Sequence, residues 1–454
     1  MTASDRAEGS AANRAAGGTT ASAAECATAH ALAEAAARRS YGRLLAFVAA
    51  RTRDIAAAED ALSEAFASAL VQWPLRGVPD NPAAWLLTAA RRRAIDGARR
   101  QATQDGAADE LLALAQPDFG SDGVMGLGGS AGATIPDDRL RLMFACAHPG
   151  IAADLRAPLM LQTVLGFDAA TIASAFRVAP SAMGQRLVRG KLRIRQAGIP
   201  FHVPESHQLP ERLDAVLAAI YAVYSDGWSD PVGTQAQRRS MAEEALWLGH
   251  LVVALLPQEP EAQGLLALML YLESRRVARR DEQGEFVPLE QQDTALWDAG
   301  LINEAEALLH RAAALGLPAL APGAVDVSRI GRYQLEAALQ SAHAERRLGG
   351  AIDWAAIVLL YDGLMQLTDS PVVAINRAVA LAQAHGVERG WTALRAVTDD
   401  ARVADYQPYW AARAELLARL GQREAAQAAY QRAVGLELDP AVRRFLLRRS
   451  ALLG

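Results

Sequence analysis

Residues 155–196 read LRAPLMLQTVLGFDAATIASAFRVAPSAMGQRLVRGKLRIRQ, and this segment has the most specific structural pattern in the chain. An apolar helix is expected to end at Gly166, a short helix to follow Asp168, and a second helix to begin at Pro180 after a three-residue turn. Two helices joined by such a turn form a helix-turn-helix, whose second helix enters the major groove of DNA. The pattern therefore predicts a DNA-binding module.

The second helix of this segment has a basic side. Met183, Leu187 and Ile194 share one side and are expected to pack inward. The polar side carries Ser181, Gln185, Arg186, Arg189 and Arg193. From Arg177 to Arg195 the chain holds 6 positive charges and no acid. Because Gln and Arg side chains hydrogen-bond to base edges, DNA binding is favoured over an ordinary amphipathic surface helix.

Another basic helix is expected upstream, at residues 83–100. Asn81 is a suitable cap and Pro82 a suitable first residue, and Trp85 and Leu86 are expected to pack inward. The helix carries Arg91, Arg92, Arg93, Arg99 and Arg100 against a single acid, Asp96. Arginines at this density suit a phosphate backbone, although arginine-rich helices also occur on ordinary surfaces.

An acidic helix precedes it. Its predicted inner face is made of Ile55, Leu62, Phe66 and Leu70, which recur at helical spacing. Its other side carries Asp54, Glu59, Asp60 and Glu64. A solvated acidic face is the alternative to a binding surface.

The composition predicts an all-α protein. Of 454 residues 99 are Ala, the best helix former, and only 6% are aromatic. The net charge of −5 argues by itself against nucleic-acid binding, but it is an average of two unlike parts. Residues 1–200 hold 22 Arg and Lys against 19 Asp and Glu, whereas residues 201–454 hold 24 against 32. Lys191 is the single lysine among the 46 basic residues.

Changes in composition predict five segments along the chain. These are a disordered amino terminus (1–25), a helical domain (26–103), a flexible linker (104–135), a helix-turn-helix domain (136–203) and a helical extension (204–454). From Glu211 onward helix is expected to follow helix, separated by short turns. About residues 354–440, two helix pairs turn at Gly386 and Gly421, and the second pair has the spacing of a tetratricopeptide repeat.

Several classes of function are disfavoured. Cys26 and Cys146 are too few for a disulfide framework or a four-cysteine zinc site, and Cys146 and His148 fit no standard zinc spacing. We expect no metal, no cofactor and no catalytic residue, because no phosphate loop or nucleophile elbow occurs. No apolar run is long enough to span a bilayer and no signal peptide is found, so a soluble, cytoplasmic protein without a membrane partner is expected.

The two basic blocks together resemble an extracytoplasmic-function sigma factor. AAAEDALSEAFASAL (56–70) is similar to the polymerase-binding helix of sigma region two, and AAWLLTAARRRAID (83–96) to the segment that recognises and opens the −10 element. GFDAATIASAFRVAPSAMGQRLVRGKLRIR (166–195) is similar to region four, which reads the −35 element. Arg91-Arg92 replaces the usual Arg-Asn pair, and Arg177 replaces a glycine common in the turn.

The resemblance extends to a subgroup of these factors with a long helical carboxyl-terminal extension. Five segments are similar to segments of that subgroup: GVPDNPAAWL, CAHPGI, EPEAQGLLALML, GRYQLEAALQSAHAE and SPVVAINRAVALA. In the subgroup a pair of cysteines often precedes the His-Pro. Here the pair is Cys146-Ala147. The extension would tune activity, as a separate anti-sigma protein does for other members. A regulatory protein or ligand bound there is a further expected partner.

The resemblance also implies roles for residues. Asp60 and Glu64 would bind core RNA polymerase. Promoter DNA would be held at the −10 element by Arg91, Arg92, Arg93, Arg99 and Arg100, and at the −35 element by Ser181, Gln185, Arg186, Arg189 and Arg193. The alternative is a one-component DNA-binding transcription regulator with a helical-repeat protein-interaction domain, although such regulators usually need one helix-turn-helix and dimerise.

Overall fold

The structure is a computed structural model, which describes residues 31, 40–105, 138–176, 178–205, 207–228, 236–316 and 330–453. Their regular elements are α-helices and short 3-10 helices, and these residues form no strand. The all-α prediction is therefore confirmed. The chain divides into two compact units, Met1–Ala219 and Ile220–Gly454, which we describe separately. The predicted segment 1–25, most of the predicted linker 104–135, and Arg177 lie outside the described residues.

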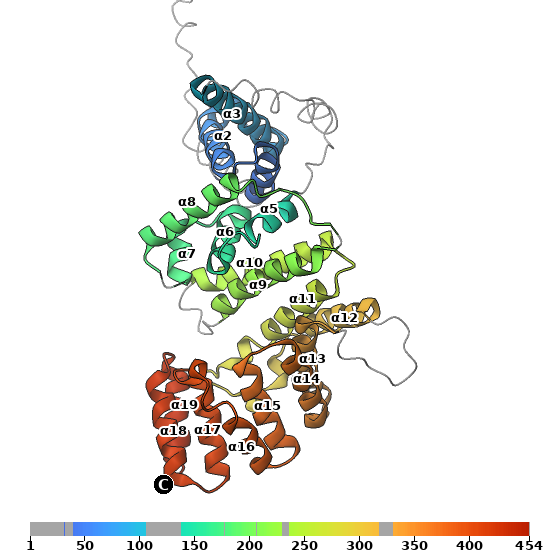
Figure 1. Cartoon of the computed structure of the whole chain (residues 1–454), viewed down its shortest axis with the longest axis vertical. Helices are drawn as coiled ribbons and strands as arrows, with labels where there is room; N and C mark the ends of the chain where they lie inside the picture. The colour runs from blue at the N-terminus through green and yellow to red at the C-terminus, as the bar shows by residue number, and fades with distance from the viewer. Residues whose placement is uncertain are drawn as a thin grey trace, which may run out of the picture. The chain divides into compact units, whose positions relative to one another are not determined.

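The first unit begins with a helix over residues 40–52, followed by α2 (Ile55–Arg76) and α3 (Pro82–Asp105) (Figure 1). The Asp54 carboxylate accepts hydrogen bonds from the N–H groups of Ala56 and Ala57 at 3.0 and 3.2 Å. Asn81 accepts one from the N–H of Ala84 at 3.0 Å, as predicted for the start of α3. These side chains satisfy backbone donors that have no partner inside a helix.

Apolar packing joins α2 to α3. Ile55 and Leu62 are fully buried, in agreement with the predicted inner face of α2. Trp73 of α2 packs edge-to-face on Trp85 of α3, with ring centroids 5.6 Å apart. The two helices therefore form one hairpin with a common core.

One residue of the predicted inner face is exposed. Leu70 has 42% of its surface in solvent, so the prediction that it packs inward is wrong. The buried side of α2 runs through Ala65, Ala69 and Trp73. Since successive helical residues point about 100° apart, Leu70 lies beside this buried side instead of within it.

Helices occupy the positions predicted for the helix-turn-helix, whose turn includes Arg177, outside the described residues. After α5 (Arg139–Cys146), the supporting helix α6 (Ala153–Leu165) ends at Gly166, whose φ of 76° is left-handed. Asp168 begins α7 (Ala169–Ala175) by accepting hydrogen bonds from the N–H groups of Ala170 and Thr171 at 2.9 and 2.8 Å. The second helix, α8 (Pro180–Gln196), has Pro180 in its first turn.

The inner side of α8 packs closely on α6. Met183, Leu187 and Ile194 are each 1% exposed, which confirms their predicted direction. Gly190 lies on the same side, and a Cβ atom there would meet Leu155 Cδ2 at 2.8 Å. A larger residue would therefore require the Leu155 and Leu159 side chains to move.

The second unit is built mainly from helices. Its first element is the later part of α9 (Leu209–Trp228). The helices that follow, before the two predicted helix pairs, are α10 (Ala236–Leu255), α11 (Pro260–Ser274), α12 (Ala299–Gly316), α13 (Arg332–Ala344) and α14 (Trp354–Leu367). Most of α11 is buried. The Glu261 carboxylate of α11 accepts hydrogen bonds from the N–H groups of Tyr333 and Gln334 at 3.0 and 3.2 Å. A carboxylate from one helix therefore satisfies the amino-terminal end of another.

The segment between α11 and α12 contradicts the prediction that helix follows helix throughout the extension. It holds only the 3-10 turns η2 (Val277–Arg279), η3 (Leu289–Gln291) and η4 (Thr294–Leu296), with an isolated antiparallel bridge between Arg280 and Phe286. Asp281 accepts hydrogen bonds from the N–H groups of Gln283 and Glu285, and Gly284 has a φ of 75°. This turn chemistry ends helical structure locally.

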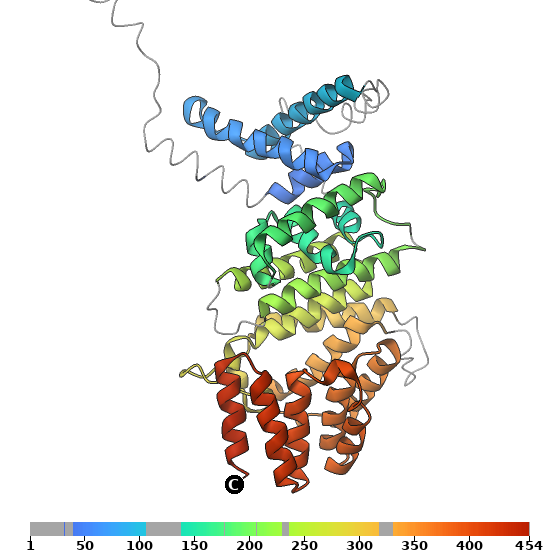
Figure 2. The same cartoon turned by 60° about the vertical axis from the view of Figure 1, so that its left-hand side comes forward.

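The end of the second unit is a row of helices that lie side by side in Figures 1 and 2. They are α15 (Pro371–Ala384), α16 (Val387–Arg395), α17 (Gln407–Arg419), α18 (Arg423–Leu436) and α19 (Pro440–Ala451). Gly386 and Gly421 turn between paired helices with φ values of 98° and 76°. The two predicted helix pairs are therefore present, whereas their assignment to tetratricopeptide repeats remains a prediction.

Within the part of the chain that the structure describes, no helix combines the length and the apolar character needed to cross a membrane.

Candidate nucleic-acid interface

The predicted −35 side of α8 faces solvent. All five of its candidate residues are exposed, and they are Ser181, Gln185, Arg186, Arg189 and Arg193. Arg189 Nε donates to the Gln185 carbonyl at 3.3 Å. Arg186 lies 3.8 Å from the Asp154 carboxylate, and both side chains are largely in solvent. Such a loose exposed pair contributes little, so the Arg186 guanidinium can exchange it for a phosphate or a base.

The arginines of α3 have more varied surroundings. Arg92, Arg93, Arg99 and Arg100 are exposed, whereas Arg91 is half-buried and its burial lowers its pKa, with a further contribution from Arg51. Arg100 Nε donates to the Asp96 carbonyl at 3.3 Å. The four exposed side chains are suited to phosphate contacts, which position a protein on DNA without specifying sequence.

The candidate polymerase-binding residues lie on the exposed side of α2. Asp60 and Glu64 are both exposed. Glu64 Oε2 lies 3.3 Å from Arg93 Nε of α3. The structure therefore brings one candidate polymerase contact and one candidate −10 contact together, on two helices of the same hairpin.

Sequence reasoning missed a charged contact between α2 and α8. The Lys191 ammonium forms an ion pair with Glu59, and their side chains are only 10% and 16% exposed. Arg195 Nη1 lies 3.0 Å from Asp54 Oδ2. We call these two ion pairs the α2–α8 contact. The single lysine of the chain was the one visible signal, because a compact ammonium and a planar guanidinium are not interchangeable.

Burial acts against the charge of Glu59. It raises the pKa of the Glu59 carboxyl, and the hydrogen bond and charge of Lys191 act in the opposite direction. Glu59 Oε1 is buried without a hydrogen-bond partner. Removing Lys191 alone would therefore leave a poorly solvated carboxylate.

A second set of contacts involves the helix 40–52 of the first unit. This helix approaches α6 so closely that a Cβ on Gly42 would lie 1.8 Å from the Val164 carbonyl oxygen. Arg51 Nη1 lies 3.0 Å from Asp138 Oδ2, and the Asp138 side chain is 6% exposed. The helix 40–52 therefore packs on α6 and pairs with the residue that precedes α5.

The cysteine and a histidine near the helix-turn-helix make local hydrogen bonds. Cys146 is buried and hydrogen-bonds to Thr163 at 3.3 Å, and its burial raises its pKa to about 12, so it remains a thiol. His148 Nδ1 accepts from the N–H of Gly150 at 3.0 Å. Among the described residues no three His, Cys, Asp or Glu side chains are grouped to hold a metal ion.

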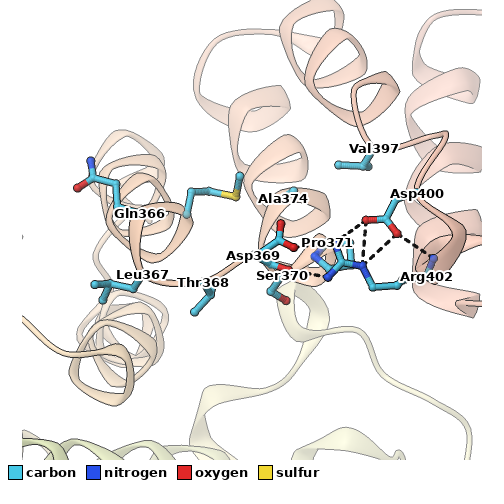
Figure 3. A pocket seen from close by; sticks show the side chains of 11 residues that line it. Gln366, Leu367, Thr368, Asp369, Ser370, Pro371, Ala374, Val397, Asp400 and Arg402 are labelled. Atoms are coloured by element: carbon cyan, nitrogen blue, oxygen red, sulfur yellow. Dashed lines mark hydrogen bonds and ion pairs between the residues drawn. The ribbon is translucent and has the colours of Figure 1, made fainter. Parts of the chain in front are cut away.

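The second unit has an open hollow of about 350 Å³ between the end of α14 and the start of α15 (Figure 3). Arg402 lies at its edge, where Asp400 and Asp369 contact its guanidinium at 2.7 and 3.2 Å. The charge of Arg402 is therefore already matched by two carboxylates, which makes the hollow a poor site for an anion.

Comparison with known proteins agrees with this geometry. Residues 37–104, which include α2 and most of α3, match the family model for sigma-70 region 2. Residues 212–313 match a family of unknown function, DUF6596. No solved structure matches the chain.

The helical hairpin and its family match define the class of protein. The chain carries a sigma-70 region 2 domain, which supports a sigma-factor-like role in transcription initiation. Such a role involves core RNA polymerase and promoter DNA. The family match points to a non-enzymatic transcription factor. An uncharacterized protein of Rhizobium meliloti (strain 1021) is 38% identical over 384 residues, which cover 85% of this chain and 87% of the relative. The chain belongs to the same family as this protein.

Proposed function

We propose that the chain is a sigma factor of the extracytoplasmic-function type, which binds core RNA polymerase and directs initiation at promoters with specific −10 and −35 elements. The observation that carries the proposal is the exposed basic side of α8, in a helix-turn-helix that shares one unit with a sigma-70 region 2 domain. A second helix of this kind, rich in Gln and Arg, is suited to reading the major groove.

In this proposal the candidate residues divide by chemistry. Asp60 and Glu64 bind the polymerase. The −10 element is bound by Arg91, Arg92, Arg93, Arg99 and Arg100, and the −35 element by Ser181, Gln185, Arg186, Arg189 and Arg193. The domains are those expected from the sequence, with residues 26–103 as region two, 104–135 as linker and 136–203 as region four.

The acidic carboxyl-terminal part would tune this activity. Its net charge of −8 over residues 201–454 is unsuited to DNA. Paired helices that pack on their neighbours build extended surfaces for proteins or peptides, and the spacing of Trp410, Leu417 and Tyr430 supports a tetratricopeptide-like surface. We infer that a regulatory protein or ligand binds this extension.

Transcription in vitro tests the proposal. The full chain with core polymerase is expected to initiate at its cognate promoter. The variant with Asp60→Lys and Glu64→Lys is expected to lose most polymerase association in a pull-down, because charge reversal replaces attraction by repulsion. Helical content should stay unchanged, since both side chains are exposed.

The DNA half of the proposal has its own control. Arg189→Gln is expected to reduce selectivity between the −35 sequence and its mismatched forms, by about 1–3 kcal/mol for a bidentate base contact. An equal loss on every sequence would assign Arg189 to a phosphate. Specific binding to a palindromic operator without polymerase would favour the one-component regulator instead.

A further inference from the structure

Positive charge is concentrated where α11 ends, in the second unit. Two arginines of this stretch are matched by carboxylates. Arg276 is held by both oxygens of Glu273, at 2.7 and 2.8 Å, and Arg280 forms an ion pair with Asp439. The first residue after the helix, Arg275, has different surroundings.

The Arg275 guanidinium has a neutral partner. Its Nη2 donates to the side-chain oxygen of Gln340, on α13, at 2.6 Å. Within the part of the chain that the structure describes, no carboxylate forms an ion pair with Arg275. Burial lowers its pKa to about 10, and Tyr224 and the more distant Glu290 act in the opposite direction. Gln340 therefore satisfies a hydrogen bond of Arg275 but leaves its charge unmatched.

Such a charge is costly to the fold. A guanidinium remains charged at neutral pH, and a buried charge that lacks a counter-charge lowers stability. A neutral side chain of similar length would avoid this cost. Buried charges without a structural counterpart are found preferentially at functional sites, so Arg275 is a candidate for binding an anion.

Two further polar groups lie close to this charge. Burial, with the charges of Arg275 and Arg346, lowers the pKa of His343 on α13 to about 4, so its imidazole is neutral at about pH 7. His343 Nδ1 is buried and has no hydrogen-bond partner among the described residues. Burial raises the pKa of Tyr361 on α14 to about 12, so this phenol keeps its proton.

These side chains combine limited exposure with access. Arg275, Gln340, His343 and Tyr361 are all intermediate between buried and exposed, so a solute can reach them in surroundings that are mostly protein. One fixed positive charge is accompanied by an amide, an imidazole and a phenol, and each of these neutral groups can donate a hydrogen bond. Arg402 differs, because two carboxylates already contact it.

We propose that Arg275, Gln340, His343 and Tyr361 form a binding site for an oxyanion group, a carboxylate or a phosphate, of a small molecule. A guanidinium can donate two parallel hydrogen bonds to either group, and the neutral donors can bind its other oxygen atoms. Binding to this site does not depend on the proposed function. The role of the bound molecule as the regulatory ligand of the extension rests on it.

Fluorine NMR of the full chain tests the site. The probes are para-fluorobenzoate and para-fluorophenyl phosphate, with uncharged para-fluorobenzamide as the comparison, all at one ionic strength set by chloride. The protein is expected to broaden the fluorine line of at least one anionic probe but not that of the amide. The probe that broadens more identifies the preferred oxyanion. Equal lines for the anions and the amide would overturn the site.

Substitutions distinguish this site from other arginines. Arg275→Met is expected to reduce the protein-induced broadening about tenfold, because a charged hydrogen-bond donor contributes about a factor of ten or more to affinity. Tyr361→Phe removes one hydroxyl and should reduce it about threefold. The matched control Arg432→Gln, which removes an exposed ion pair with Asp405, should leave it unchanged. Broadening that survives both Arg275→Met and Tyr361→Phe would overturn the site.

Hydrogen exchange separates a binding role of Arg275 from a structural one. In Arg275→Met, exchange across α11 and α13 is expected to be no faster than in the wild type, because the substitution removes an unmatched buried charge. Faster exchange would assign Arg275 to the fold and contradict the proposal. Tyr361→Phe then shows whether the probe still depends on this place in the molecule.

The chain itself holds a possible competitor. Glu290 is exposed and acts on Arg275 from a distance, so its carboxylate could fold back onto the guanidinium. Glu290→Gln is expected to bind the probe at least as strongly as the wild type. A probe that binds only after this substitution would show that Glu290 occupies the site, and an external ligand would be excluded.

Transcription tests the regulatory role separately. The preferred probe, at a saturating concentration, is expected to change promoter-specific transcription by the wild type and by Arg432→Gln at least about twofold, and to have no effect with Arg275→Met. Binding of the probe without any change in transcription would overturn the regulatory role. If the wild type does not transcribe with core polymerase, the proposed function fails, whereas the NMR result still decides whether the site exists.

Discussion

The contact between α2 and α8 and the contact between α17 and α18 join helices by different means. In the first, two ion pairs connect segments that are more than a hundred residues apart in the chain. In the second, Leu417 packs among Ala426, Tyr430 and Ala433 across a turn of three residues. Apolar burial is expected to survive changes in salt, whereas pairs of charges weaken as ions screen them.

The difference suggests different roles. A hairpin whose helices are adjacent in sequence and bury their shared side has no reason to separate while the protein is folded. The nearly buried charges of Lys191 and Glu59 would have to be rehydrated before they could meet other partners, because breaking a buried pair leaves an uncompensated charge. The carboxyl-terminal pairs are therefore an apolar scaffold, whereas the α2–α8 contact depends on paired charges.

The largest effect is expected from the scaffold. Leu417→Ala removes a side chain that is 2% exposed and should lower local stability by about 2–5 kcal/mol. Peptide-resolved hydrogen exchange across α17 and α18 is the appropriate measurement, because a chain of two units need not unfold in one step. The control Leu438→Ala, at a side chain 72% exposed, should stay within about 0.5 kcal/mol. If the two substitutions lower the stability equally, burial of Leu417 does not stabilise the α17–α18 pair.

A smaller effect is expected where the helix 40–52 meets α6. Gly42→Ala would place Cβ 1.8 Å from the Val164 carbonyl oxygen, so the helices must shift, at about 1–3 kcal/mol. Gly97→Ala is the matched control in α3, where a Cβ would have no atom within 4 Å. Because alanine reduces the backbone freedom of the unfolded chain, this variant should stabilise the folded protein by up to about 1 kcal/mol. Peptide-resolved hydrogen exchange across the helix 40–52, α6 and α3 compares the two variants. Similar shifts would mean that the close approach is not tight.

The smallest effect is expected from a local cap. Asp168→Ala should cost about 1 kcal/mol, because the N–H groups of Ala170 and Thr171 lose their acceptor. These hydrogen bonds, with that of Thr171 first, lower the pKa of Asp168 below its usual 3.8. The stabilisation is therefore complete at pH values above the usual pKa of 3.8, and it is lost as the pH falls through the lowered pKa of folded Asp168. Unfolding curves at about pH 7 and at about pH 2 should show the difference between wild type and variant shrinking in acid.

Much of the local structure could be predicted from the sequence. Asn81, Gly166, Asp168 and Pro180 mark helix ends through chemistry that acts within a few residues. The inward side of α8 follows from spacing alone, because three apolar residues recur on one side of a helix. The same local reasoning failed at Leu70, where the neighbouring helix covers a slightly different side of α2.

The helices, their caps and the exposed basic side of α8 follow from local sequence, because they depend on residues a few positions apart. The contacts of Lys191 with Glu59 and of Glu64 with Arg93 arise from tertiary packing. No periodicity connects residues 132 positions apart, and the direction in which one helix approaches another depends on the packing of whole surfaces. For the same reason the irregular segment between α11 and α12 depends on a distant partner, since its Phe286 packs on Phe445 with ring centroids 5.4 Å apart.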